Sequence, residues 1–214
     1  MDPRDYLKRA TDLKKQGQIK EAIDQLRICF QLSKELNYQL MIDDFLRLPM
    51  YYAYDNDFQN ATIEIEKLEK HSTSNIELFK IFDTKRKILQ KEKKIKESVI
   101  YSLLSIIFEF KNLDSDQFSG LQFEKECYEK KIITKKEYEQ SLKNAELFQK
   151  RVKDSFLDEI NLKKLLNSKI KIKDSKIQFE IYEILKLLLQ KTNSKSQQEL
   201  KLEAEKHIEN IEII

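Results

Sequence analysis

The scarcity of glycine and proline limits the folds that this chain can adopt. Only two glycines and two prolines occur among its 214 residues, where average usage predicts about 15 and about 11. Tight turns with positive φ mostly need glycine, and a sandwich or barrel of this length needs many of them. The composition therefore excludes an all-β fold and argues against a doubly wound nucleotide-binding fold. It predicts an all-α protein with more than about 60% helix.

Apolar residues recur at helical spacing along most of the chain, which predicts a series of helices with short connections. The expected helix starts are marked by Pro3, Ile19, Tyr38, Asp57, Ser74, Ile95, Thr134, Ser175 and Ser196. Four of these starts carry a residue pair of the capping-box type, in which a hydroxyl residue is followed three positions later by Glu or Gln. The helix over residues 38–54 contains Pro49, which should kink it. A long helix over residues 134–167 is expected to break near 158–161.

A polar stretch over residues 112–120 contains the second glycine and predicts a linker between two halves, residues 1–111 and 121–214. Two helical segments, residues 98–110 and 177–189, are apolar around nearly their whole circumference. A helix of this kind must be covered on several sides. We therefore expect residues 121–214 to form a helical cap or bundle that packs on the first half.

The first half contains an internal repeat. The segments KKQGQIKEAI from Lys14, AYDNDFQNAT from Ala53 and QKEKKIKESV from Gln90 align, with spacings of 39 and 37 residues. In the three segments the turn position is occupied by Gly17, Asn56 and Lys93. The large apolar position is occupied by Ile19, Phe58 and Ile95, and the small position by Ala22, Ala61 and Ser98. A small residue at the third position lets two helices approach closely, so each segment is typical of the turn in a helical hairpin.

This repeat resembles the tetratricopeptide repeat, whose usual length is 34 residues. The family's large, small and turn positions are matched in the first hairpin by Tyr6, Ala10, Leu13, Gly17, Ile19, Ala22, Leu26 and Cys29. The second hairpin departs from the pattern at Pro49, Asn56 and Leu68, and the third at Arg86, Lys93 and Ser102. Over residues 3–111, the resemblance implies a short right-handed α-solenoid of about three helical hairpins. The stretch DDFLRLPMYYAYDNDFQNA also resembles a group of small bacterial repeat proteins without a settled function.

The resemblance implies that the first helix of each hairpin lines a concave groove that binds another protein or peptide. The candidate partner-binding residues are Arg4, Thr11, Lys14, Asp43, Met50, Tyr54, Lys80, Asp83, Lys87 and Lys91. This mixture of lysines, aspartates and one exposed tyrosine suits an acidic or amphipathic peptide. Because successive helical residues point about 100° apart, Tyr54 should face the groove and Tyr52 the partner helix of its own hairpin. We predict a non-catalytic protein-binding module or scaffold.

One run of basic residues, over positions 85–96, suggests an alternative function. It contains a single acid, Glu92, and seven basic residues: Lys85, Arg86, Lys87, Lys91, Lys93, Lys94 and Lys96. The run is either a solvated helix end in a lysine-rich chain or a patch for an anionic partner, including nucleic acid. The net charge of only +3 shows no global basic excess, and no aromatic residue interleaves the run to stack on bases. Nucleic-acid binding is therefore possible but not favoured.

Residue types that many catalytic and metal sites need are scarce. The two histidines are His71 and His207, and the chain has no P-loop, GxGxxG, HExxH or GxSxG motif. Cys29 and Cys127 lie far apart and are expected to be reduced thiols. We expect no enzymatic activity, no metal and no cofactor. The longest uncharged apolar run, residues 98–108, is shorter than the roughly 20 residues of a membrane span, so we expect no membrane association and a cytoplasmic protein.

Overall fold

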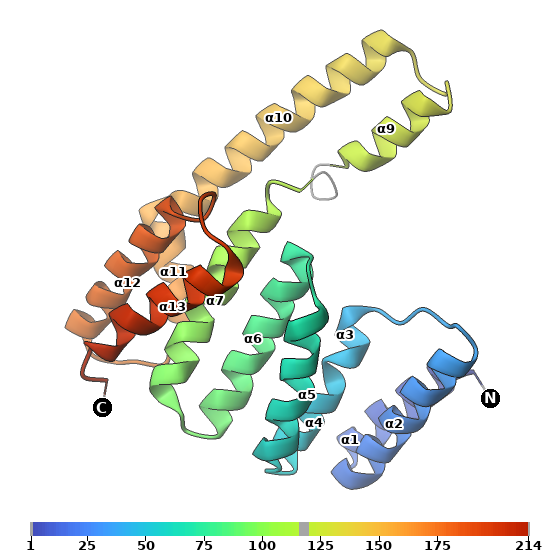
Figure 1. The fold of residues 1–214 in the computed structure, drawn as a ribbon, viewed down its shortest axis with the longest axis vertical. Coiled ribbons are helices and arrows are strands. Elements are labelled where there is room, and N and C mark those ends of the chain that lie inside the picture. Colours follow the sequence, from blue (N-terminus) through green and yellow to red (C-terminus); the bar gives the residue numbers. More distant parts are fainter. Residues whose placement is uncertain (1, 116–119, 214) are drawn as a thin grey trace. The chain divides into compact units, whose positions relative to one another are not determined.

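The computed structural model describes residues 2–115 and 120–213, and within these ranges it contains helices and no strand. Helices account for 78% of the described residues. The prediction of an all-α protein is therefore confirmed. The chain divides into two compact units, Met1–Ser105 and Ile106–Glu212 (Figure 1). No helix within the described ranges has both the length and the apolar character needed to cross a bilayer.

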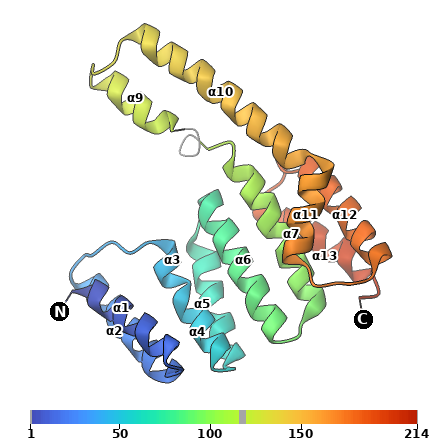
Figure 2. The same ribbon diagram turned by 180° about the vertical axis from the view of Figure 1, so that it is seen from behind.

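The first unit consists of successive helices that pack on one another. They are α1 (Pro3–Lys15), α2 (Ile19–Glu35), α3 (Ile42–Phe45), α4 (Arg47–Tyr54), α5 (Phe58–His71), α6 (Asn75–Lys91) and the first part of α7 (Ile95–Asn112). Helix α1 packs on α2, α2 on α4, α4 on α5 and α5 on α6 (Figures 1 and 2). Helix α4 also contacts α6. The core of this unit contains fully buried Leu26, Ile65, Ile81 and Phe82.

The three predicted hairpin turns share one backbone geometry. Gly17, Asn56 and Lys93 all have positive φ, of 79°, 62° and 66°. In each turn the following amide donates to the carbonyl five residues before it, at 2.9 Å: Gln18 to Leu13, Asp57 to Tyr52 and Lys94 to Leu89. This bond is the signature of the Schellman motif, which ends a helix with a left-handed residue. The predicted turns are therefore confirmed, although two of the three lack glycine.

Pro49 divides the helix that was expected over residues 38–54. Proline has no amide hydrogen, and its ring collides with the carbonyl four residues before it. That carbonyl belongs to Phe45, where α3 ends. Helix α4 then begins at Arg47, so that Pro49 lies in a first turn where amides need no partner. The helical part also begins later than predicted, at Ile42 rather than at Tyr38.

In its described residues, the second unit contains the end of α7 and five further helices. They are α9 (Leu121–Glu129), α10 (Lys135–Leu157), α11 (Glu159–Lys169), α12 (Ser175–Gln190) and α13 (Gln197–Glu209). Helices α9 and α10 form an antiparallel hairpin (Figure 2), and α11, α12 and α13 pack in sequence. The core of this unit includes Leu162, Leu166, Ile181, Leu185, Leu188, Leu200, Ala204 and Ile208.

Side-chain caps set the helix starts in the second unit. Asp158 accepts hydrogen bonds from two amides of α11, which confirms the predicted break in the long helix. Thr134 and Ser196 begin capping boxes as predicted. The box predicted at Ser175 is wrong by one residue, because the carboxylate of Asp174 caps α12 instead. A carboxylate accepts two amides at once and competes well with a neighbouring hydroxyl.

The predicted linker, residues 112–120, includes residues 116–119, which lie outside the described residues. Its first residue, Asn112, is the last residue of α7, and Gly120 precedes α9 with a φ of 76°. The division between the compact units falls earlier, after Ser105 within α7. The packing of residues 121–214 on the first half stays a prediction.

Candidate functional site

The predicted groove residues lie on α1, α3, α4 and α6, and Tyr54 connects three of these helices. The Lys14 ammonium, in the last turn of α1, lies 5.1 Å from the centre of the Tyr54 ring. The Lys91 ammonium, in the last turn of α6, lies 4.6 Å from the same ring. Tyr54 itself ends α4. One exposed aromatic ring therefore holds a cation from the hairpin before it and another from the hairpin after it.

Tyr52 and Tyr54 differ in burial as predicted. Tyr54 is 38% exposed, whereas Tyr52 is 6% exposed. The Tyr52 hydroxyl accepts a hydrogen bond from Arg27, whose guanidinium carbon lies 5.6 Å from the centre of the Tyr52 ring. Arg27 belongs to α2, so the Tyr52 hydroxyl contacts the preceding hairpin. The sequence had predicted a contact with the partner helix of its own hairpin instead. Tyr54, by contrast, is partly accessible to a partner.

Two residues of this surface, Arg47 and Tyr51, are absent from the sequence-based candidates. Arg47 donates to the hydroxyl of Thr11 over 3.2 Å and pairs with Asp44 over 3.2 Å, which joins α4 to α1 and α3. Tyr51 is buried, its ring centre lies 6.4 Å from that of Tyr54, and burial raises the pKa of its hydroxyl. Arg47 and Tyr51 precede Tyr54 by seven and three residues, which places all three on one helix face. That spacing is the signal that would have identified them.

The charged candidates are joined in pairs. Lys80 of α6 donates to Asp43 of α3 over 2.5 Å, and Lys87 pairs with Asp83 over 2.7 Å within α6. Ion pairs of partly exposed side chains contribute at most about 1 kcal/mol each. An incoming partner with its own charges would therefore exchange these pairs at little cost in free energy.

Three further groove candidates lie on α1 and α4. Arg4 is near the other end of α1, where its guanidinium donates to the hydroxyl of Tyr38. Thr11 accepts from Arg47 and donates to the carbonyl of Leu7 over 2.9 Å. Met50 is half-buried on α4. The structure thus gathers the two lysines around Tyr54, whereas Arg4 and Thr11 make other contacts.

The basic run is only partly a surface feature, and two of its seven predicted members must be corrected. Lys85 and Arg86 are each 7% exposed. The Lys85 ammonium lies 2.8 Å from Glu69 and 3.5 Å from Glu66, both on α5, and 4.6 Å from the ring centre of Tyr101 on α7. Burial alone would lower the pKa of Lys85, but Tyr101 and Glu69 together outweigh it and raise that pKa. Lys85 therefore acts as a buried link between helices.

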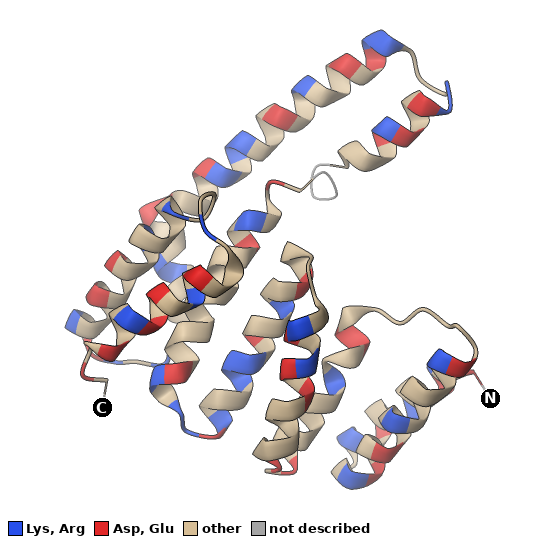
Figure 3. Ribbon diagram, in the orientation of Figure 1, with Lys and Arg blue, Asp and Glu red and all other residues tan. Residues whose placement is uncertain are grey.

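The other members of the basic run are spread over different environments. Arg86 pairs with Asp83 over 2.9 Å, and Lys94 pairs with Glu92 over 2.6 Å. Lys93 is exposed in the turn and Lys96 is half-buried. Figure 3 shows Lys and Arg interspersed with Asp and Glu along the helices of this unit. The exposed part of the run therefore excludes Lys85 and Arg86.

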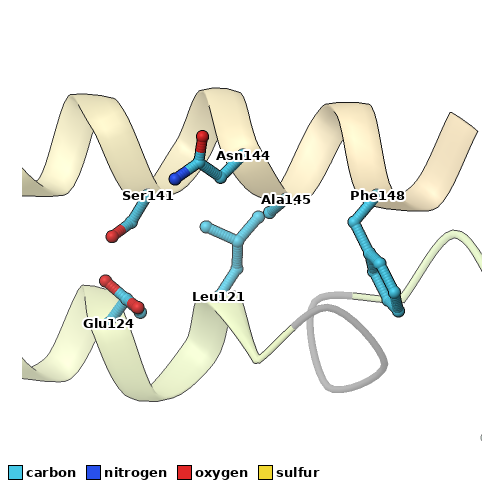
Figure 4. A pocket seen from close by; sticks show the side chains of 6 residues that line it. All are labelled: Leu121, Glu124, Ser141, Asn144, Ala145 and Phe148. Atoms are coloured by element: carbon cyan, nitrogen blue, oxygen red, sulfur yellow. The ribbon is translucent and has the colours of Figure 1, made fainter.

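A small cavity lies between α9 and α10 in the second unit (Figure 4). Its volume is about 230 Å³, and its lining residues are Leu121, Glu124, Ser141, Asn144, Ala145 and Phe148. The lining offers one carboxylate, one hydroxyl and one amide. In residues 2–115 and 120–213, no group of three or more His, Cys, Asp or Glu side chains is arranged to hold a metal ion.

Comparison with known proteins gives no match to this chain, whether with family models, with curated proteins or with solved structures. The resemblance to the tetratricopeptide repeat therefore depends on the residues of this chain alone. It stays a prediction.

Proposed function

We propose that the first half of this chain is a short right-handed α-solenoid of the tetratricopeptide type and that it binds a protein segment. Three hairpin turns with the same Schellman geometry support this proposal. A hairpin of two amphipathic helices buries only one face, so neighbouring hairpins must stack to complete a core. The contacts of α2 with α4 and of α5 with α6 are of this kind.

The observation that carries the proposal is the position of Tyr54 between two lysines. Energetically dominant residues of protein interfaces are most often aromatic or arginine, and they lie near the centre of the interface. Tyr54 is an exposed aromatic ring at the junction of three hairpins, with Lys14 and Lys91 over it. A partner that covers this ring would bury apolar surface and bring its own acidic groups against both lysines.

The proposed partner is an acidic or amphipathic peptide segment, and the proposed role is that of a non-catalytic scaffold. Lys14 and Lys91 supply positive charge on both helices beside Tyr54, while the pair of Asp43 and Lys80 lies further along α3 and α6. Nucleic-acid binding through residues 85–96 has less support, because Lys85 and Arg86 are buried. Phosphate contacts need accessible cations.

A peptide selection with a matched control variant tests the proposal. Peptides enriched from a random phage library by the full chain would be titrated against three proteins: the parent, Tyr54→Ala and Tyr128→Ala. Tyr128 is 37% exposed, nearly the same as Tyr54, but lies on α9 in the second unit. We expect Tyr54→Ala to weaken binding at least about fivefold, which corresponds to about 1 kcal/mol, and Tyr128→Ala to leave it unchanged.

The salt dependence separates the two functions. Nucleic-acid binding weakens steeply with salt, with a slope set by the number of neutralised phosphates, whereas a peptide that places acidic groups on only two lysines should respond less steeply. An oligonucleotide that binds the chain with a steep salt dependence, together with the absence of any enriched peptide, would favour the nucleic-acid function. Peptides that bind Tyr54→Ala as tightly as the parent would contradict the proposed site.

A further inference from the structure

A second candidate site lies within the second unit, where residues of four helices line a half-open cavity of about 240 Å³. Its apolar walls are Phe110 of α7, Leu157 of α10, Leu162 of α11, and Tyr182 and Leu189 of α12. Leu162, Tyr182 and Leu189 are buried, whereas Leu157 is 46% exposed. Leu157 therefore lies at the mouth, and the deeper walls are fixed parts of the core.

Two lysines, each with a carboxylate neighbour, lie close to the Tyr182 wall of this cavity. The Lys163 and Lys186 ammonium groups lie 5.0 Å and 5.4 Å from the centre of the Tyr182 ring, and Lys186 also lines the cavity. Each lysine has a carboxylate neighbour on its own helix, Glu159 at 2.5 Å and Glu183 at 3.2 Å. Ion pairs of this exposed type contribute little to stability, so an added anion can take the place of Glu183 beside Lys186 at low cost.

We propose that this cavity binds a small carboxylate with an apolar tail. The tail lies among the leucine and aromatic walls, and the carboxylate meets Lys186, the lysine that lines the cavity. A dry apolar cavity of about 150 Å³ already takes up benzene in a protein core. A cavity of about 240 Å³ therefore suits an alkyl chain of about six to eight carbons or a substituted aromatic ring. Inorganic phosphate would use the lysines but leave the apolar walls unfilled.

A chain-length series tests the apolar part of the site. Butanoate, hexanoate and octanoate would be titrated calorimetrically against the full chain at neutral pH. Burial of each further methylene should tighten binding about fourfold until the cavity is full. Methyl resonances of Leu162 and Leu189 should shift in NMR spectra, while those of Leu26 in the first unit should not. Equal affinities along the series would show attraction by surface charge only and would overturn the proposal.

Two variants and one matched control test the location. Leu157→Trp fills the mouth of the cavity and should weaken octanoate binding at least about tenfold. Leu147→Trp is the control, because Leu147 is 48% exposed on the same helix and does not line this cavity. Lys186→Gln should weaken octanoate binding about threefold or more and leave octan-1-ol binding unchanged.

The outcomes of this experiment are distinguishable. If Leu157→Trp disturbs folding, as circular dichroism would reveal, Lys186→Gln still tests the site because it changes an exposed side chain. Binding that is lost equally in Leu157→Trp and Leu147→Trp, or that Lys186→Gln does not affect, places the ligand elsewhere. The absence of heat and of methyl shifts with millimolar octanoate would also overturn the proposal.

Discussion

Lys91 holds its ammonium group 4.6 Å from the ring centre of Tyr54, so that α6 touches α4 through a cation and an aromatic ring. Lys14 makes the same kind of contact from α1. At exposed sites such contacts contribute about 0.5–1 kcal/mol each. They are strong enough to orient the lysines and weak enough to rearrange when a partner binds.

The two tyrosines of α4 should respond differently to truncation. Tyr52→Ala should lower the free energy of unfolding by about 3 kcal/mol or more, because it removes a buried ring and the hydrogen bond from Arg27. Tyr54→Ala should lower it by only about 1 kcal/mol, since its ring is partly exposed and its contacts are with lysines. Urea denaturation followed by circular dichroism measures both. A larger loss for Tyr54→Ala would show that the helix face assigned to the groove is wrong.

The turn residues offer a second prediction, in which one substitution stabilises the protein. A left-handed conformation costs a residue with a side chain about 1–2 kcal/mol. Lys93→Gly should therefore raise the free energy of unfolding by about 1 kcal/mol, and Gly17→Ala should lower it by about the same amount. An added Cβ at Gly17 would meet no atom within 4 Å, so its cost is conformational.

Lys8→Gly is the control for the turn experiment, because Lys8 is exposed in the middle of α1. Glycine inside a helix should lower the free energy of unfolding by about 1 kcal/mol. Thermal or urea unfolding of the three variants would give opposite signs for Lys93→Gly and Lys8→Gly. The same sign for both would mean that Lys93 does not need its left-handed conformation.

Sequence reasoning located the hairpins because their turns depend on local chemistry. The aligned positions of Gly17, Asn56 and Lys93 predicted three turns, and positive φ values at all three confirm them. The break at Pro49 also followed from the chain itself, although proline ended one helix and began another where a kink was expected. Features that depend on residues a few positions apart can be predicted from the sequence, because few alternative conformations compete with them.

The burial of Lys85 could not be predicted in the same way. Helical periodicity indicates which side chains share a face, but it does not indicate which elements cover that face. Lys85 is covered because α5 supplies Glu69 and α7 supplies Tyr101, and these partners are 16 residues apart from Lys85 in each direction. The same limit applies to Tyr54, whose two lysines come from different hairpins.

Lys85 should be structural rather than a binding residue, which a double-mutant cycle can test. Lys85→Met should lower the free energy of unfolding by about 3 kcal/mol, because it leaves the carboxylate of Glu69 without its buried partner. The double variant with Glu69→Leu should recover a good part of that loss, since replacing both members of a buried pair by apolar groups is often nearly neutral. Urea denaturation of the parent, both single variants and the double variant gives the coupling.

Lys87→Met is the matched control for this cycle, because Lys87 is exposed on the same helix and pairs with Asp83. Its loss should be at most about 1 kcal/mol. If Lys85→Met is no more harmful than Lys87→Met, Lys85 is solvated. All seven basic residues of the run over residues 85–96 would then again be candidates for nucleic-acid binding.

Glu203 should make the stability of the second unit depend on acid pH. Hydrogen bonds from Lys191 and Lys195 lower the pKa of this carboxyl from 4.5 to about 2. Because the pKa is lower in the folded state than in the unfolded chain, the contribution is fully present above about pH 4.5 and is lost as the pH falls towards about 2. Glu203→Gln should lower the free energy of unfolding by about 1–2 kcal/mol at pH 7, given that ion pairs near a surface are screened. The difference in free energy of unfolding between Glu203→Gln and the parent should shrink steadily between pH 4.5 and pH 2, as measured by urea denaturation at several pH values.

Glu205→Gln, on the same helix, is the control, and its free energy of unfolding should follow that of the parent at every pH. A difference for Glu203→Gln that stays constant down to pH 2 would show that this carboxyl does not titrate between its two lysines.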